Sequence, residues 1–385
     1  MVEGLSHRLA REFSDKISSG QWPVGARVPT TRELAATYGV SVNTIQNVFR
    51  QLEATDLVER QPRRGGFVKS KPKGKLPVRP ATAQATTIAV AGHHVRDNEP
   101  ADAWAYRIIG GCDRELTGAG FHTALFSFDS NDPLAVEKVL AKIDQAGETL
   151  AGVLCFIHPA SRRLPGELDA RDIPWVSINP ARDHAAHNFV AQDALRAGRL
   201  IGRCLARMAL PRIVILSEQI TIGRSSSALY HGFMEGWLAR GGRSRDVDAV
   251  ITEGLGENHG YDAMRDHLAA YGRPAAILAT GDFRAIGASR ALRDAGCDVG
   301  RDVYVIGGTG LDVTAFTHPP LTASEVPMEQ MGEAAAHMLL EMAREGVRRM
   351  IGRYIPARLI VRESCPIPAE ILEEESNVLA QESGT

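Results

Sequence analysis

The sequence predicts an α/β protein in two parts, a small N-terminal unit of helices with one β-hairpin and a large body of two parallel β-sheets covered by helices. The first observation is that residues 5–69 carry short helical patterns followed by two strand patterns. The second is that apolar strands and amphipathic helices alternate from residue 87 onward. About 280 residues of this alternation exceed one comfortable core, which predicts two lobes with a cleft between them.

The composition places the chain among globular proteins of the cytoplasm. Of its 385 residues, 44% are hydrophobic, and no apolar run approaches the roughly 20 residues that span a bilayer. The N-terminus is charged and amphipathic, unlike a signal peptide, so we expect a cytoplasmic protein with no membrane partner. The scattered cysteines form no Cys-x-x-Cys pair and predict reduced thiols, without a disulfide frame or a metal site; they are Cys112, Cys155, Cys204, Cys297 and Cys365.

The formal net charge of −2 hides a division along the chain. Residues 1–80 contain 14 Lys and Arg against 7 Asp and Glu, which leaves 30 against 39 for residues 81–385. A basic head on an acidic body suggests that only the head meets a polyanion, although random scatter of charge would explain the numbers equally well. The sequence motifs are needed to distinguish a polyanion-binding head from random scatter of charge.

The head contains three helical patterns. The first covers residues 5–19 and ends at Gly20. Thr30 and Glu33 form a capping box that opens a second, short helix through Tyr38. Ser41 caps a third helix, whose apolar positions are Val42, Ile45, Val48, Phe49 and Leu52. Two strands, Leu57–Glu59 and Gly66–Lys69, follow and are joined by the basic turn Gln61-Pro62-Arg63-Arg64-Gly65.

The remaining boundaries follow from composition. Residues 71–86 lie in a stretch rich in Pro, Lys and Ala without apolar periodicity, and we expect a linker there. The predicted domains are therefore a head of residues 1–70, this linker, a body of residues 87–365 and an acidic, frayed tail of residues 366–385. The predicted strands of the body are Thr87–Ala91, Thr123–Phe128, Gly152–Ile157, Trp175–Ile178, Arg212–Leu216, Val247–Thr252, Ala276–Thr280 and Val303–Gly307. The predicted helices are 104–118, 133–146, 193–208, 226–240, 259–271 and 284–295.

Two helices joined by a Gly-containing turn and followed by a basic hairpin predict a winged helix-turn-helix. Such a unit suits DNA, because a helix fits the major groove and a basic turn reaches phosphates, although a plain helical hairpin has the same pattern. Beyond this pattern, residues 5–69 resemble the GntR family of bacterial regulators. The matching residues are Gly20, Pro23, Gly25, Arg27-Val28-Pro29-Thr30-Thr31-Arg32-Glu33-Leu34-Ala35, Tyr38-Gly39-Val40-Ser41, Thr44-Ile45, Leu52, Leu57-Val58 and Gly65-Gly66-Phe67-Val68.

The GntR resemblance implies double-stranded operator DNA as a partner and assigns the residues that contact it. They are Arg32 on the second helix, and Ser41, Val42, Asn43, Thr44 and Gln46 at the start of the recognition helix. Several relatives have arginines where this chain has Val42 and Gln46, so we expect a different operator, since Arg favours guanine. Arg63, Arg64 and Gly65 would serve the wing, with a solvated basic turn as the alternative.

The body resembles the LacI/GalR effector domain, which is similar to periplasmic sugar-binding proteins. The matching residues are Asp193, Gly232-Phe233, Pro274-Ala275-Ala276-Ile277, Gly281-Asp282-x-x-Ala285-Ile286-Gly287, Val305-Ile306-Gly307, Pro319-Pro320-Leu321-Thr322, Met331-Gly332-x-x-Ala335 and Arg362-Glu363-Ser364. The combination resembles the architecture of arabinose repressors, a GntR head on a periplasmic-binding-protein-like body. It implies a homodimeric repressor that responds to a small-molecule effector, a sugar or sugar derivative. An activator is the alternative within this class.

Candidate effector-binding residues follow from the same resemblance and from their positions. Asp282 matches the family carboxylate that accepts hydrogen bonds from effector hydroxyls, although Gly281 replaces the usual Asn; the alternative is a helix N-cap. Arg224 beside three serines could hold a carboxylate or phosphate, or simply lie exposed at a capped helix. The other candidates are Asp193 and also Trp104, Tyr106 and His158, for which core packing is the alternative.

We expect that this protein is not an enzyme. Gly254-x-Gly256 and Gly307-Gly308-x-Gly310 lack the strand, the helix and the downstream acid of a nucleotide site. No nucleophile elbow, P-loop or zinc signature is present, so no catalytic residue, cofactor or metal is assigned. An enzyme fused to a GntR head, such as an aminotransferase, is the alternative, and an absorbance band of pyridoxal would reveal it.

Overall fold

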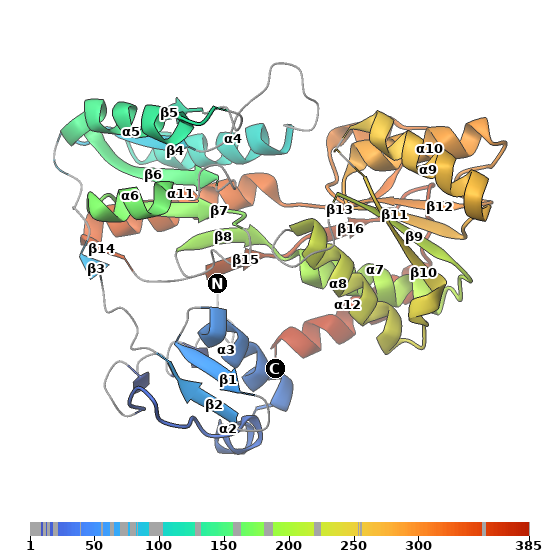
Figure 1. Cartoon of the computed structure of the whole chain (residues 1–385), viewed down its shortest axis with the longest axis horizontal. Helices are drawn as coiled ribbons and strands as arrows, with labels where there is room; N and C mark the ends of the chain where they lie inside the picture. Colours follow the sequence, from blue (N-terminus) through green and yellow to red (C-terminus); the bar gives the residue numbers. More distant parts are fainter. Residues whose placement is uncertain are drawn as a thin grey trace.

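The computed structural model describes most of the chain in three connected units. It covers residues 9–10, 13, 16–17, 22–38, 40–54, 57–61, 65–69, 76–77, 82, 84–91, 103–127, 132–156, 163–180, 188–218, 225–252, 254, 256–348 and 352–384. Figure 1 shows the head below a body whose two lobes lie side by side.

The head is a winged helix-turn-helix, as predicted. Its described elements are α2 (Thr31–Tyr38), α3 (Val42–Ala54), β1 (Val58–Gln61) and β2 (Gly65–Val68). The capping box is confirmed, because the Thr30 amide donates to Glu33 Oε2 at 2.7 Å and the Glu33 amide donates to Thr30 Oγ1 at 3.3 Å. Of the first predicted helix, Leu9, Phe13 and Ile17 are described, and all three are buried in the core of the head.

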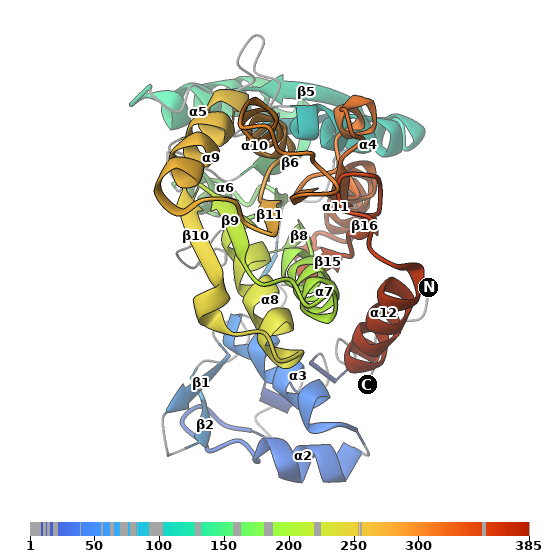
Figure 2. The same cartoon turned by 90° about the vertical axis from the view of Figure 1, so that its right-hand side faces the viewer.

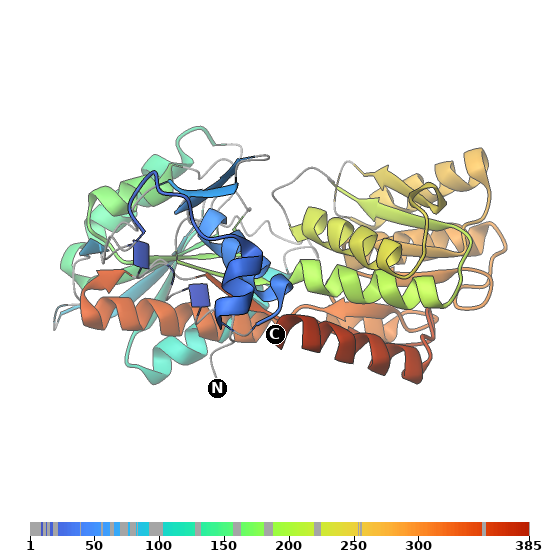
Figure 3. The same cartoon turned by 90° about the horizontal axis from the view of Figure 1, so that it is seen from below.

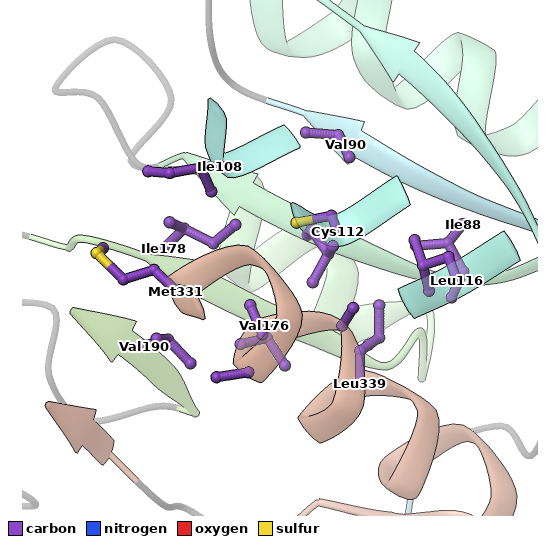
Figure 4. Packing of buried hydrophobic residues seen from close by; sticks show 14 of the residues in the cluster. Ile88, Val90, Ile108, Cys112, Leu116, Val176, Ile178, Val190, Met331 and Leu339 are labelled. Atoms are coloured by element: carbon purple, nitrogen blue, oxygen red, sulfur yellow. The ribbon is translucent and has the colours of Figure 1, made fainter. Parts of the chain in front are cut away.

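Lobe 1 is a six-stranded sheet covered on both faces. Its strand order is β15-β8-β7-β6-β4-β5, and all its pairs are parallel. The strands are β4 (Thr87–Ala91), β5 (His122–Phe126), β6 (Leu150–Phe156), β7 (Trp175–Ile178), β8 (Phe189–Gln192) and β15 (Gly352–Ile355). The helices are α4 (Ala103–Gly118), α5 (Ala135–Ala146), α6 (Leu164–Ala170) and α11 (Met328–Glu345). Side chains of α4 and α11 fill the core on one face of this sheet (Figure 4).

Lobe 2 has the same layered design. Its sheet has the order β10-β9-β11-β12-β13-β16, parallel except for the last pair. The strands are β9 (Ile213–Ser217), β10 (Val247–Ile251), β11 (Ala276–Ala279), β12 (Tyr304–Gly307), β13 (Thr322–Glu325) and β16 (Arg358–Ile360). The helices are α7 (Ala194–Arg207), α8 (Ser225–Ala239), α9 (Glu257–Tyr271), α10 (Asp282–Asp294) and α12 (Ala369–Gly384).

The chain passes between the lobes three times among the described residues. It leaves lobe 1 between β8 and α7 at Asp193, returns between β13 and α11 at 326–327, and leaves again between β15 and β16 at 356–357. These three short crossings are where one lobe can rotate against the other.

Two expectations about the ends of the body are wrong. Residues 366–385 are not a frayed tail, because Ala369–Gly384 form α12, whose Glu375 and Leu379 are buried. Part of the predicted linker is structured, because β3 (Leu76–Pro77) pairs with β14 (Val347–Arg348) of lobe 1. The structure adds further elements to the strands and helices expected in the body, among them β8, β13, β15, β16, α6 and α11.

Four glycines bring α7 and α8 into backbone contact. A Cβ on Gly198 or Gly202 would lie 2.2 Å from a carbonyl oxygen of α8, and one on Gly232 or Gly236 would lie 2.1 or 2.2 Å from a carbonyl oxygen of α7. No neighbouring side chain can relieve these contacts, since the obstacle is backbone. The close approach therefore requires glycine at all four positions.

No helix in the described part of the chain is both long and apolar enough to cross a membrane. Four of the five cysteines are buried, and burial raises the pKa of the Cys112 thiol to about 12. The described residues contain no pair of bonded cysteines.

The α7–α8 contact predicts a large effect of one substitution. Gly232→Val should lower the free energy of unfolding by at least about 2 kcal/mol, because overpacking against backbone forces the helices apart. Gly118→Ala is the matched control, since a Cβ there meets nothing within 4 Å. This control should be neutral or stabilise by about 0.5–1 kcal/mol. Urea unfolding would measure both, and equal stabilities would contradict the prediction.

Candidate functional site

The recognition helix α3 begins at a cap formed by two hydroxyl side chains. Ser41 Oγ accepts from the Thr44 amide at 3.1 Å and lies 2.9 Å from Thr44 Oγ1. Thr44 is fully buried, so the prediction that it contacts DNA is wrong in this structure; it supports the start of the helix instead. Ser41 and Val42 are exposed on the same turn, with Val42 42% exposed.

The other predicted DNA contacts are placed in part. Arg32 is exposed on α2, and Gln46 is half-buried on α3. Asn43 lies in the first turn of α3, but its side chain is outside the described part of the structure. Gly65 pairs with Gln61 across the hairpin, which places the wing turn between them, while Arg63 and Arg64 lie outside the described residues. Arg50, a residue that the sequence analysis did not select, is exposed further along α3 and donates to Asn47 Oδ1 at 2.7 Å.

Asp282 lies where β11 gives way to α10, at the carboxyl end of the lobe 2 sheet. It is 1% exposed, and its carboxylate accepts from the amides of Thr309 at 3.1 Å and Leu311 at 2.6 Å. Burial raises the pKa of this carboxyl, and the hydrogen bonds from the loop amides oppose that rise. The alternative of a helix N-cap is wrong, because Gly281 holds the N-cap position. Asp282 thus holds the loop 309–311 against α10.

A second polar group lies at the same sheet edge and was missed by the sequence analysis. Arg284, 1% exposed on α10, donates to Thr280 Oγ1 at 2.7 Å and lies 3.7 Å from Glu218 Oε2. Glu218 Oε1 in turn accepts from Ser226 Oγ at 3.3 Å, at the start of α8. Burial lowers the pKa of the Arg284 guanidinium, while Glu218 opposes this effect. The signal available in the sequence was an arginine on the otherwise apolar face of this helix.

Arg284 also lies beside position 281, where this chain departs from the family motif. A Cβ built on Gly281 would lie 3.6 Å from Arg284 Nη2, in ordinary van der Waals contact with the guanidinium. Nε of Arg284 has no hydrogen-bond partner within the described structure. A buried cation with an unused donor is costly unless another polar group reaches it.

The other effector candidates that the structure describes lie on α4 of lobe 1 or at a crossing between the lobes. Trp104 packs edge-on against Phe156 in lobe 1 at a centroid distance of 5.6 Å, and Tyr106 is 52% exposed on α4. Asp193 lies at the first crossing between lobes, where its side chain caps α7 by accepting from the Arg196 amide at 3.1 Å. Arg224 and His158 lie outside the described residues.

The loop that Asp282 holds also contacts lobe 1. Leu311 belongs to the core cluster of lobe 1, and Phe283, the neighbour of Asp282, packs against the same cluster. Asp312 lies 3.5 Å from Arg107 of α4, and Arg107 also forms two hydrogen bonds with Glu329 at 2.6 and 3.1 Å. The contact between lobes therefore depends on the same loop as the polar group around Asp282.

The described residues contain no cluster of His, Cys, Asp or Glu that could hold a metal ion. The chemistry of the site is hydrogen bonding. Arg284 and Ser226 offer donors, and Glu218 offers acceptors. Such a set at the carboxyl ends of parallel strands is suited to binding a small polar molecule.

Comparisons with known proteins agree with both parts of this description. Residues 5–68 match the model of bacterial regulatory proteins of the gntR family, and residues 210–365 match a periplasmic binding protein-like domain. The transcriptional regulator CelR of Thermobifida fusca is 25% identical over 346 residues, which cover 88% of this chain and 98% of that protein. The ribose operon repressor of Escherichia coli is 34% identical over 235 residues, covering 60% of this chain and 69% of the repressor.

Among solved structures, a complex of the transcriptional regulator CelR with cellobiose superimposes with a TM-score of 0.63 at 22% identity, covering 88% of this chain and all of that one. The likeness at this identity concerns the fold. Together with the sequence relatives and the two matched domains, it leads to one assignment. The chain belongs to the bacterial transcription regulators, and it joins a gntR-family DNA-binding head to a periplasmic-binding-protein-like sensor domain of the kind found in sugar and purine repressors.

Proposed function

We propose that this regulator is a homodimeric repressor, acting in the cytoplasm, whose affinity for its operator is changed by a sugar or sugar derivative bound between the two lobes. The observation that carries the proposal is the polar group of Glu218, Thr280 and Arg284 at the edge of lobe 2, next to the loop on which the lobe contact depends. An enzymatic function has no comparable support among the described residues.

The head supports DNA reading by a small set of exposed side chains. Arg32 provides charge for the phosphate backbone, and Ser41 provides a hydroxyl for a phosphate or a base edge. Val42 is an exposed apolar residue at the start of the recognition helix, and it suits the methyl group of thymine. This chemistry favours an operator richer in A·T pairs than an arginine-reading relative would select.

A hydroxyl-rich ligand fits the balance of charge at the lobe 2 edge. One guanidinium and one carboxylate cancel, which suits a neutral molecule that both accepts and donates hydrogen bonds, as a sugar does. The ring of Trp104 in lobe 1 could cover an apolar sugar face. The CelR relative has been seen with cellobiose, which supports a carbohydrate without specifying which one.

Switching would proceed through the loop 309–312. A ligand hydroxyl that approaches Asp282 competes with the amides of this loop for the carboxylate oxygens. Displacement of the loop changes the contacts of Leu311 and Asp312 with lobe 1 and so changes the angle between lobes. We propose that the effector in this way weakens operator binding, as in a repressor relieved by its inducer.

The dimer is proposed from the edge strands of the two sheets. Leu125 on β5 and Ile251 on β10 are each 52% exposed, and both strands are outermost in their sheets. Unpaired edges with exposed apolar side chains are commonly covered by another chain. A symmetric dimer would also place two recognition helices on a near-palindromic operator.

The DNA assignment predicts a loss of electrostatic binding. Arg32→Ala should weaken binding to duplexes selected by the intact protein and reduce the salt slope by about 1, because one phosphate contact releases about one counterion. Arg301→Ala, which removes an exposed arginine of lobe 2, should leave both quantities unchanged. Fluorescence anisotropy at several salt concentrations would measure them. An unchanged slope for Arg32→Ala would contradict the assignment.

The effector assignment predicts selective loss of ligand stabilisation. A panel of sugars, sugar acids and sugar phosphates is screened by thermal shift, where a ligand at 100 times its Kd stabilises by about 2.7 kcal/mol. Arg284→Met should weaken binding of the best ligand by about 10- to 100-fold, since a hydrogen bond to a charged group is worth about 1.5–3 kcal/mol. Arg290→Met is the control on the same helix. Equal affinities of the two variants would place the ligand elsewhere.

The dimer proposal predicts dissociation by a charge on an edge strand. Leu125→Lys combined with Ile251→Lys should raise the dimer Kd, because lysines desolvate poorly in an interface. Tyr271→Lys, at a 66% exposed residue of α9, provides the control. Analytical ultracentrifugation measures the association. A double variant that associates as tightly as the control would exclude these strands from the interface.

A further inference from the structure

The C-terminal helix α12 lies beyond both matched domains. The periplasmic-binding-protein-like match ends at residue 365, and α12 covers Ala369–Gly384. The helix carries no lysine or arginine, and its acidic residues are Glu370, Glu373, Glu374, Glu375 and Glu382. A strongly acidic helix at the end of a chain would be expected to remain in solvent, so its buried contacts require a partner of opposite charge.

Arginines of lobe 2 provide that partner. Glu375 is 1% exposed and forms a bidentate pair with Arg240, at 2.9 Å to Oε1 and 2.8 Å to Oε2. Arg203 and Arg207 of α7 lie 3.9 and 3.5 Å from the same carboxylate. A buried carboxylate surrounded by three guanidinium groups is held firmly, because loss of the carboxylate would leave partly buried guanidinium groups without this counter-charge.

The same face of α12 continues the attachment along α7. Glu382, two turns after Glu375, accepts from Arg203 Nη2 at 2.8 and 3.0 Å, and Glu374 pairs with Arg207. Leu379 is buried between these ion pairs. The spacing of three, four and seven residues places these side chains on one face of the helix. Figure 3 shows α12, in dark red, running along α7.

The middle of α12 also borders the third crossing between the lobes. A cavity of about 270 Å³ is lined by α7, by α12 and by the crossing segment, with Pro356, Ala357, Arg358 and Leu359 on one side and Leu372, Ser376 and Leu379 on the other. A change in the angle between lobes alters the backbone at this crossing. The helix therefore lines the same cavity as a segment that connects the two lobes.

The far end of α12 contacts the DNA-binding head. Residues of α12 lie against α3, and Figures 1 and 2 both show the C-terminus beside that helix. The head is thus in contact with a helix that is fixed to lobe 2. Since α3 is the recognition helix, this contact bears on the part of the head that reads DNA.

The covalent connection of the head leads to the other lobe. In the segment after the head, β3 pairs with β14, which follows α11 of lobe 1. Thr82 Oγ1 donates to the Glu148 carbonyl at 3.3 Å, and the Thr86 amide donates to the Thr149 carbonyl at 3.0 Å, again in lobe 1. The chain then enters the lobe 1 sheet as β4. The chain after the head is therefore attached to lobe 1, while the head itself contacts α12, which is fixed to lobe 2.

We infer that α12 is a coupling element, which makes the position of the head depend on the angle between the lobes within a single chain. Because α12 is fixed to lobe 2, the α12–α3 contact carries a rotation of lobe 2 to the head. The head follows lobe 2 for as long as this contact persists. This goes beyond the proposed function, since it needs neither the identity of the effector nor the dimer.

The test measures where the head lies relative to lobe 2. Nitroxide labels are attached at Thr37→Cys on α2 and Arg265→Cys on α9, two exposed positions, in a Cys297→Ser background because the other cysteines are buried. Pulsed electron paramagnetic resonance of the full chain should give one narrow distance distribution. Deletion of residues 369–385 should abolish this narrow peak and replace it with a broad distribution.

A shorter deletion guards against loss of the fold. Removal of residues 381–385 takes away the end of α12 nearest the head, together with the Glu382–Arg203 pair, and keeps the Glu375–Arg240 pair that fixes the helix to lobe 2. It should broaden the distribution in the same way. Glu373→Gln, on the exposed face of α12, is the matched control and should preserve the narrow peak. Thermal unfolding confirms that each variant is folded.

The outcomes separate this inference from the proposed function. If both deletions leave a folded protein with the narrow peak intact, α12 is only a cover on lobe 2 and the inference is overturned. If Glu373→Gln broadens the distribution as much as the deletions do, the effect is not specific to the contact. Neither result concerns operator or effector binding, which are tested by Arg32→Ala and Arg284→Met.

Discussion

The carboxylate of Asp282 accepts hydrogen bonds from two amides of the loop after β12, and the contact between the two lobes is built on this loop. The loop contributes Leu311 to the core of lobe 1, and Asp312 reaches Arg107 on its surface. Burial of an acid normally destabilises the folded protein, because the charged carboxylate loses its hydration. Here that cost is offset by backbone donors that would otherwise be unsatisfied, so the acid and the loop require each other.

Charge organises the molecule at two levels. On the scale of the chain, a basic head precedes an acidic body, which directs the polyanion to one end. On the scale of side chains, arginines connect elements of the body through ion pairs and hydrogen bonds. Arg107 joins α4 to α11, Arg284 lies beneath the strand ends, and Arg240 fixes the C-terminal helix. Most of these pairs are partly buried, so salt screens them less than it screens the contacts of the head with DNA.

The features that could be predicted from sequence are those with local causes. The capping box at Thr30 and Glu33 depends on residues three apart, and the strands β4 and β7 are apolar runs bounded by turns. The features that could not be predicted depend on distant partners. Glu375 is buried because it pairs with Arg240. This arginine lies 135 positions away in the sequence, and the acidic composition of the tail gives no sign of the pair.

The candidate site also has some features that could be predicted from the sequence and others that could not. The resemblance located Asp282 at a strand end, which the structure confirms, but its hydrogen bonds go to a loop 27–29 residues further along the chain. Thr44 was selected for its position at the start of a recognition helix, and only packing reveals that it is buried. Arg284 was overlooked because a charged residue on an amphipathic helix is usually assumed to face solvent.

The close approach of Arg284 to Gly281 has a consequence for how such a sensor could change during evolution. A Cβ at position 281 would be in ordinary van der Waals contact with the guanidinium, so substitutions at 281 and 284 change each other's surroundings. An asparagine at 281 would bring a side-chain amide next to a buried cation whose Nε has no partner within the described structure. Loss of the arginine would instead remove the cation beside Glu218, a carboxylate that is partly exposed. The effect of a mutation at either position therefore depends on the residue at the other, and the two positions would be expected to change together in a lineage that moves between these two forms of the motif.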